Sequence, residues 1–220
     1  MKIYGSKNSR SIRPVWALEE AHASYDYQRI WMMKGEGQSP AFKAVNPAGK
    51  IPVLVDGGLV LTESMAQVFY IAEKFPESNL LPSDPKARAE TYRWVFYTVS
   101  EVESPLWAIA QHRFALPEDK RVPQLEPTSV WQLSRGLRVF EKMLATRQYV
   151  AGDSFTLADI LATHCITWSL SAKIEAVGDA CLAYVGRMKS REAYKAAVAR
   201  ETLEAEKQEA ALAAVEPKTN

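Results

Sequence analysis

Residues 46–54, with the sequence Asn-Pro-Ala-Gly-Lys-Ile-Pro-Val-Leu, constrain the fold of this chain of 220 residues more than any other stretch. Pro47 and Gly49 favour a turn, and the apolar residues at the end of the segment favour a strand that begins behind Pro52. A cis peptide bond between Ile51 and Pro52 has only a modest cost, and it turns the backbone of Ile51 outward at the entrance to the strand. The free N–H and C=O of Ile51 can then pair with an extended peptide, which is recognition by strand addition.

Strand and helix signals alternate over roughly the first 75 residues. We expect strands at residues 2–4, 25–30, 51–55 and 59–61, and helices at residues 14–20, 39–43 and 63–75. Beyond about residue 85 the pattern is helical throughout. We therefore predict an α/β domain at residues 1–78, a linker at residues 79–86 and an all-helical domain at residues 87–220.

Charge and cysteine content narrow the class of protein. Lysine and arginine number 27 and aspartate and glutamate 26, so the chain lacks the basic excess of a nucleic-acid binder. No apolar run approaches membrane-spanning length and the N-terminus lacks a signal-peptide core, which predicts a cytoplasmic protein with no membrane partner. Cys165 and Cys181 are too few for a disulfide framework and are predicted to be buried thiols. The histidines His22, His112 and His164 are too scattered for a metal site.

Glu63 and Ser64 stand at the head of a predicted amphipathic helix. The N-terminus of a helix presents unpaired N–H groups and partial positive charge, so it can hold a carboxylate. Acidic and hydroxyl residues also stabilise a first helical turn without any ligand. Both interpretations are compatible with the sequence.

Four motifs, taken together and in order, resemble the cytosolic glutathione S-transferases, in a bacterial type with a serine-type active site. They are residues 46–54, the pair Glu63-Ser64, the pattern Ser9-x-Ser11-x-Arg13, and the run Phe155-Thr156-Leu157-Ala158-Asp159-Ile160. The resemblance covers nearly the whole chain. It implies an N-terminal thioredoxin-like domain, an all-helical C-terminal domain, a homodimer, and glutathione as co-substrate with no metal or prosthetic group.

The resemblance also gives the binding residues a role. Ser64 would hold the α-carboxylate of the γ-glutamyl group, and Glu63 would face the neighbouring ammonium. Ile51, placed by Pro52, would pair with the cysteinyl unit. Lys50 is the cation best placed to meet the second carboxylate, although an ordinary surface lysine would look the same.

Catalysis by such a protein needs a group that stabilises the glutathione thiolate, and the loop before the first helix offers hydroxyl groups. The spacing from Arg13 favours Ser9 as the donor, by resemblance to the serine-type classes, with Asn8 and Ser11 as close alternatives. Capping of the first helix explains the serines equally well. Tyr4 lies within the first strand, so a tyrosine-type mechanism fits less well. The N-terminal domain contains no cysteine, which disfavours disulfide exchange by an enzyme thiol.

The electrophile is expected to bind between the domains, and the candidates for its pocket are Trp107, His112 and Phe114. Family resemblance further implies that a carboxylate, either Glu101 or Glu103, reaches the γ-glutamyl ammonium across a dimer interface. The sequence does not choose between these two glutamates.

Other stretches predict structure and not chemistry. Residues 92–97 are dense in aromatic side chains, which favours core packing or a dimer contact. Thr156 and Asp159 form the pattern of a capping box, ahead of a mostly apolar helix at about residues 157–170 that we expect to be buried. Residues 201–220 predict a terminal helix with few large apolar anchors.

The preferred interpretation is a glutathione S-transferase that conjugates glutathione to small hydrophobic electrophiles, with a role in detoxification. One alternative is a glutathione-dependent isomerase, but the Gly49-Lys50 turn resembles that of general transferases more than that of the isomerases. A second is a non-catalytic binding or regulatory protein that keeps the fold. Retention of Ser9, Lys50, Glu63 and Ser64 together favours an enzyme, because a scaffold needs neither carboxylate anchors nor a thiol donor.

Overall fold

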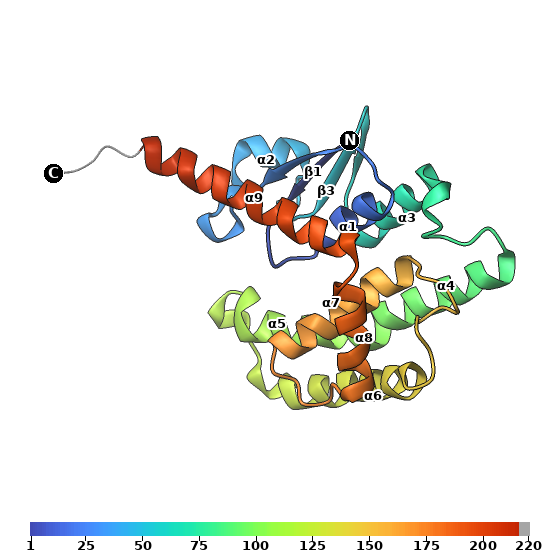
Figure 1. Ribbon diagram of the computed structural model, residues 1–220. Coiled ribbons are helices and arrows are strands. Elements are labelled where there is room, and N and C mark those ends of the chain that lie inside the picture. The colour runs from blue at the N-terminus through green and yellow to red at the C-terminus, as the bar shows by residue number, and fades with distance from the viewer. Residues whose placement is uncertain (216–220) are drawn as a thin grey trace. The chain divides into compact units, whose positions relative to one another are not determined.

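The computed structural model describes the backbone of residues 1–215 and the side chains as far as residue 210, and the last part of the predicted tail, residues 216–220, lies outside it. The chain forms two units, which Figure 1 traces from the blue N-terminus to the red last helix. One unit contains Met1–Ser78 together with the chain from Arg191 onward. The other contains Asn79–Ser190.

A four-stranded sheet in the order β2-β1-β3-β4 forms the centre of the first unit. The strands are β1 (Lys2–Gly5), β2 (Asp26–Arg29), β3 (Val53–Asp56) and β4 (Leu59–Leu61). β1 is parallel to β2, and β3 is antiparallel to both β1 and β4. The four predicted strands are confirmed, except that β3 begins at Val53. Ile51 and Pro52 therefore stand before the ladder and not within it.

Three helices of the first unit follow from local sequence signals. They are α1 (Ile12–Glu20), α2 (Pro40–Val45) and α3 (Ser64–Lys74). α1 supplies the crossover that the parallel pair of β1 and β2 requires. α2 begins where the hydroxyl of Ser39 accepts the N–H of Phe42 at 3.2 Å, with Pro40 in the first position. The core beneath these helices is fully buried and apolar, and includes Ile3, Trp16, Leu18, Leu54, Val68 and Ile71.

The last helix, α9 (Glu192–Val215), packs against α1 and β2 of the first unit, as the red helix beside α1 in Figure 1 shows. Ala197, Glu201 and Ala205 recur every four residues and are all buried, so one stripe of α9 faces the unit. Two of these three are alanines, which explains why a helix without large apolar anchors still packs closely.

Polar and aromatic contacts hold the start of α9. The guanidinium of Arg191 donates to both carboxylate oxygens of Glu20, at 2.6 and 2.7 Å. The rings of Trp16 and Tyr194 meet edge to face with centroids 4.9 Å apart. These contacts differ from the predicted boundary, which assigned residues 87–220 to one helical domain. Helical periodicity does not reveal which unit a helix packs against.

The second unit is all-helical. Its helices are α4 (Pro85–Tyr97), α5 (Ser104–Ala110), α6 (Glu126–Leu144), α7 (Leu157–Ser171) and α8 (Asp179–Lys189). α7 is buried on most faces, as predicted. Cys165 on α7 and Cys181 on α8 are buried thiols, as predicted. Burial, with a contribution from Glu141, raises the pKa of the Cys181 thiol to about 12.

The predicted linker at residues 79–86 contains residues that belong to the core of the second unit. Leu80 is fully buried, and its carbonyl accepts the N–H of Leu157 at the start of α7 at 2.8 Å. Leu81 is also buried. Prolines and polar residues around these leucines resemble a linker in sequence, but the two leucines fix the segment to α7.

A wide, π-type turn at Thr98–Glu103 joins α4 to α5. Pro105 has no N–H, so the carbonyl of Glu101 lacks its usual helical partner. That carbonyl faces Gly136 of α6, where a Cβ would lie only 2.5 Å from its oxygen. The hydroxyl of Tyr97 donates to the carbonyl of Gly136 at 3.1 Å. A glycine at this crossing therefore sets how closely α6 approaches the α4–α5 segment.

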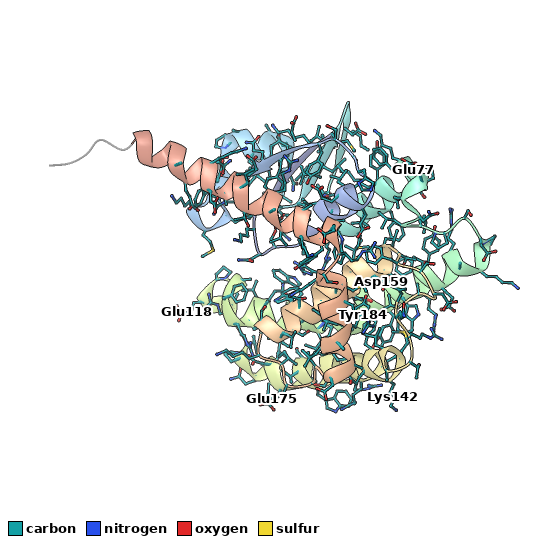
Figure 2. All side chains as sticks on the ribbon, viewed as in Figure 1. Glu77, Glu118, Lys142, Asp159, Glu175 and Tyr184 are labelled. Atoms are coloured by element: carbon teal, nitrogen blue, oxygen red, sulfur yellow. The ribbon has the colours of Figure 1, made fainter. Side chains whose placement is uncertain are left out.

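Asp159 anchors the start of α7 from inside the core. Its Oδ1 accepts the N–H of Val150 at 2.9 Å and the hydroxyl of Tyr184 at 2.8 Å, and its Oδ2 accepts the N–H of Thr156 at 2.9 Å. Figure 2 labels Asp159 and Tyr184 close together between α7 and α8. The predicted capping box of Thr156 and Asp159 is confirmed.

Replacement of Asp159 by asparagine should lower the free energy of unfolding by about 3 kcal/mol, because an amide nitrogen would face a backbone N–H at this donor-rich position. Urea denaturation measures the change. Asp153→Asn alters an exposed residue nearby and should have almost no effect. Equal stability of the two variants would contradict the anchoring role of Asp159.

Candidate functional site

Hydrogen bonds close the segment between β1 and α1, Ser6–Ser11, which we call the serine loop. The hydroxyl of Ser9 donates to the carbonyl of Ser6 at 2.7 Å and accepts the N–H of Ser11 at 3.1 Å. The hydroxyl of Ser11 accepts the N–H of Ser6 at 3.1 Å and lies 2.8 Å from the hydroxyl of Ser9. Because Ser9 uses its proton on the carbonyl, Ser11 must be the donor between the two hydroxyl groups.

The three residues predicted to activate the thiol differ in how accessible they are to a ligand. Ser11 is fully buried and makes no side-chain cap at α1. Asn8 is exposed and has φ of +60°, a left-handed conformation that asparagine tolerates. Ser9 is partly exposed, and it accepts a backbone N–H at the approach to α1. Neither hydroxyl caps α1, because that of Ser11, the N-cap residue, makes no cap bond and that of Ser9 accepts an N–H that precedes the helix.

Asn46 builds the turn that precedes β3. Its side-chain amide donates to the carbonyl of Lys50 at 2.7 Å, and its side-chain oxygen accepts the N–H of Ala48 at 3.1 Å. Gly49 has φ of +63°, and a Cβ there would lie 2.5 Å from the carbonyl oxygen of Gly37. The turn therefore needs glycine at this position for its conformation and for the close approach of a neighbouring loop.

The backbone of Ile51 is open to a partner. The Ile51–Pro52 bond is cis, as predicted, and the ladder of β3 begins only at Val53. In the part of the chain that the structure describes, the N–H and C=O of Ile51 make no hydrogen bond. Lys50, next to it, is exposed, and no carboxylate of a described residue lies within ion-pair distance of its ammonium.

Ser64 lies buried at the first position of α3, where its hydroxyl accepts a hydrogen bond from Nη1 of Arg13 at 3.0 Å. Arg13 belongs to the first turn of α1 and is itself buried. Glu63, just before Ser64, is exposed and has φ of +63°, a strained conformation for a residue other than glycine. The chain therefore bends sharply at Glu63, directly before the first N–H groups of α3.

Gln67 connects α3 to the two chain segments before and after the β3–β4 hairpin. Its buried side-chain amide donates to the carbonyl of Pro52 at 2.9 Å and to that of Leu61 at 3.0 Å. Sequence reasoning missed Gln67, Asn46 and Arg13 as site residues. Asn46 and Arg13 lay inside the motifs, but nothing in the sequence revealed their partners, and Gln67 looked like an ordinary polar residue on a helix.

These contacts bring most of the predicted binding residues to one part of the first unit. Arg13, in the first turn of α1 directly after the serine loop, bonds to the start of α3, and Gln67 joins α3 to Pro52. The surface therefore offers a lysine ammonium, open backbone groups and a helix N-terminus. That combination suits an extended peptide with carboxylates at its two ends.

The predicted pocket residues all belong to the second unit. A cavity of about 320 Å³ opens there between α5, α7 and the turns that follow them. Phe114 lines it. Trp107 is not a lining residue, but its ring centroid lies 6.3 Å from that of Trp168, which is. His112 does not line it, and its Nδ1 accepts the N–H of Val122 at 3.1 Å.

Residues 1–73 match the family described as glutathione S-transferase, N-terminal domain, and residues 106–184 match glutathione S-transferase, C-terminal domain. Glutathione S-transferase F10 of Arabidopsis thaliana is 33% identical over 167 residues, which cover 73% of this chain and 76% of the relative. The chain belongs to the glutathione S-transferase family.

Solved structures agree with this assignment. A glutathione S-transferase domain-containing protein of Marinobacter aquaeolei VT8 has a TM-score of 0.80 at 26% identity, over 88% of this chain and all of that one. The theta class glutathione S-transferase of Xanthomonas axonopodis pv. citri, solved with glutathione bound, has a TM-score of 0.73 at 29% identity, over 90% and 96% of the two chains.

The comparisons confirm three predictions for this glutathione S-transferase. They are the thioredoxin-like domain followed by an all-helical domain, the membership of the family, and the activity of a glutathione transferase enzyme. Among the described residues, no cluster of three or more histidine, cysteine or acidic side chains is arranged to hold a metal ion. None of the described helices has the length and apolar character needed to span a membrane.

Replacement of Gln67 by methionine should lower the free energy of unfolding of the transferase by about 2 to 4 kcal/mol, because the buried carbonyl of Pro52 and the partly buried carbonyl of Leu61 lose their donor. Urea denaturation again gives the measurement. Gln132→Met changes an exposed glutamine of α6 and serves as the control. If both variants unfold at the same urea concentration, Gln67 does not hold the site together.

Proposed function

We propose that this transferase binds glutathione on the first unit, stabilises its thiolate with Ser9, and adds it to small hydrophobic electrophiles as a cytoplasmic, homodimeric detoxification enzyme. The observation that carries the proposal is the state of the Ser64 hydroxyl. Its oxygen accepts from Arg13, so its own proton remains available to a carboxylate. A hydroxyl donor beside the first N–H groups of a helix is a suitable anchor for the γ-glutamyl carboxylate.

Arg13 strengthens the carboxylate anchor that Ser64 provides. The guanidinium is buried and always charged, and it polarises the Ser64 hydroxyl toward donation. Glu63 lies next to Ser64 and is exposed, which suits a contact with the γ-glutamyl ammonium. The glutamate of a second subunit, Glu101 or Glu103, remains a further candidate for the same ammonium.

The rest of the tripeptide has matching groups. The open N–H and C=O of Ile51, which Pro52 follows, offer two hydrogen bonds to the cysteinyl unit. The exposed ammonium of Lys50 suits the glycyl carboxylate, since no carboxylate of the described chain competes for it. When Ser64 and Lys50 hold the two carboxylates of glutathione, its thiol lies between these two anchors.

Ser9 is the best of the thiol-activating candidates because it alone combines partial exposure with a hydroxyl group; Ser11 is buried and Asn8 offers only a neutral amide. To reach sulfur, the Ser9 proton must leave the carbonyl of Ser6. The exchange replaces a neutral hydrogen bond of about 1 kcal/mol with a charge-assisted one of about 1.5 to 3 kcal/mol. The difference lowers the pKa of the thiol by about one unit.

The cavity of the second unit supports a hydrophobic electrophile. Its volume of about 320 Å³ lies at the small end of ligand pockets, and leucine, isoleucine, alanine and aromatic side chains line most of it. Phe114 offers an exposed ring to a planar substrate, and Trp107 would contribute through its contact with the ring of Trp168. His112 would act indirectly, by fixing the turn that carries Phe114. In the conjugation, a carbon–sulfur bond forms as the thiolate attacks, and the leaving group departs with its electron pair.

Exposed apolar side chains at the end of α4 and in the turn that follows it support the homodimer. Phe96 is 64% exposed and Val99 is 40% exposed, one turn apart on the same helical segment. Two such residues on one face are typical of a protein–protein interface. The cytoplasmic location is proposed because reduced glutathione, the co-substrate, keeps thiols reduced in that compartment.

Replacement of Ser9 by alanine should raise the thiol pKa of bound glutathione by about one unit and leave the dissociation constant of glutathione nearly unchanged. Ser64→Ala should do the reverse, weakening affinity about tenfold without moving the thiol pKa. Isothermal titration with reduced glutathione measures affinity, and thiolate absorbance across pH measures the pKa. Ser24→Ala, at an exposed site, is the control. An unshifted thiol pKa in the Ser9 variant would exclude Ser9 as the donor, and wild-type protein that does not bind glutathione would exclude the function.

Replacement of Phe96 by glutamate should convert the proposed dimer into a monomer, because a charge in an apolar interface costs desolvation free energy. Sedimentation velocity measures the change in mass. Arg93→Glu on the same helix changes an exposed residue that pairs with Glu90, and provides a matched charge reversal. A wild-type protein that sediments as a monomer would refute the dimer.

A further inference from the structure

A carboxyl group of α9 lies buried beside the serine loop, and the chemistry described so far does not use it. Glu201 is only 3% exposed, and buried alanines flank it on the same stripe of the helix. The hydroxyl of Tyr27, on β2, donates to its Oε1 at 3.4 Å. A buried carboxyl group is far more costly than an apolar side chain of the same size, so its presence points to a role beyond packing.

Tyr27 connects Glu201 to the serine loop through Gly5, the last residue of β1. A Cβ on Gly5 would lie 2.8 Å from the hydroxyl oxygen of Tyr27 and 2.8 Å from that of Ser11. Both hydroxyl groups therefore crowd the same side of Gly5, where only glycine leaves room for them. The hydroxyl of Ser11 is in turn 2.8 Å from that of Ser9. A short path of packed polar groups thus runs from α9 to the proposed thiol donor.

The groups that face Glu201 come from three elements: Tyr27 from β2, Lys7 from the serine loop, and Tyr194 from α9 itself. Burial raises the pKa of Glu201 to about 8, against the lowering effects of the Tyr27 hydrogen bond and the Lys7 ammonium. Burial and Glu201 together raise the pKa of Tyr27, so its phenol keeps its proton. At neutral pH, Glu201 therefore acts mainly as a neutral acceptor for the Tyr27 hydroxyl.

We propose that Glu201 is a positioning residue for thiol activation, which fixes the Tyr27 hydroxyl against Gly5 and Ser11 and thereby holds Ser9 in place. The inference rests on the proposed function, because it takes the serine loop as the part that stabilises the thiolate. It makes α9 part of the structure that positions the proposed thiol donor.

The decisive comparison is between leucine and glutamine at position 201. Glu201→Leu fills the same space with apolar atoms, so if Glu201 only packs, this variant should be at least as stable and as active as wild type. We expect instead a raised thiol pKa for bound glutathione and a kcat/KM about fivefold lower at pH 6.5, because Tyr27 loses its acceptor. Glu201→Gln keeps a carbonyl acceptor and should restore both values to within about twofold.

The dependence of kcat/KM on pH distinguishes wild type, which has a carboxyl group at position 201, from Glu201→Gln, which has an amide there. As pH rises through about 8, Glu201 loses its proton and puts a negative charge beside the loop that must stabilise a thiolate. In wild type, kcat/KM should therefore fall above that pH. Glu201→Gln cannot ionise and should keep its plateau.

Glu206→Leu, at an exposed position of the same helix, is the matched control. If wild type, Glu201→Leu and Glu201→Gln share one thiol pKa and one pH profile, the inference is overturned while the proposed function stands. Wild type that gives no thiolate signal with glutathione overturns the proposed function and the inference with it. Should Glu201→Leu fail to fold, Tyr27→Phe removes the hydroxyl alone, and an unchanged thiol pKa in that variant overturns the inference equally.

Discussion

The first turn of α3 makes the hydrogen bonds on which the binding surface of the first unit depends. Three segments surround it: the serine loop with the first turn of α1, the turn before β3, and the end of β4. The serine loop and the turn before β3 form no ladder, and the ladder of β4 with β3 ends at Leu61. Arg13 bonds to Ser64, and Gln67 bonds to the carbonyls of Pro52 and Leu61, so one helical turn fixes all three segments. Because the bonds to Ser64 and Pro52 are buried, water does not compete for their partners, and the loss of either leaves an unpaired polar group.

The two units each bury a carboxyl group, and the contrast between them is informative. Asp159 accepts hydrogen bonds from Val150, Thr156 and Tyr184 at 2.8 to 2.9 Å, as expected of a structural anchor. Among the described residues, Glu201 has a single hydrogen-bond donor, the hydroxyl of Tyr27 at 3.4 Å. Burial raises the pKa of Asp159 only to about 6, because its donors oppose the effect, whereas that of Glu201 rises to about 8. The carboxyl group with fewer hydrogen-bond donors is the one that lies beside the serine loop.

Sequence reasoning succeeded where a signal is local. The strands, the capping box at Thr156 and the cis bond before Pro52 depend on residues within a few positions of each other, and such patterns are visible in the chain itself. It failed where a polar residue has a distant partner. Arg13 and Ser64 are 51 positions apart, and Tyr27 and Glu201 are 174 apart. A glutamate on a charged, alanine-rich helix resembles a solvated residue until the fold brings β2 against it.

The packing of α9 also makes the first unit discontinuous in the chain. Its sheet and first three helices precede Asn79, but the helix that covers β2 and α1 follows Ser190. During synthesis the whole second unit must therefore leave the ribosome before the first unit can be completed. Until then the surface that receives Glu201 stays exposed, with Tyr27 lacking its acceptor. The first unit thus has its sheet and its first three helices early in synthesis, but it becomes complete only when α9 packs against β2 and α1.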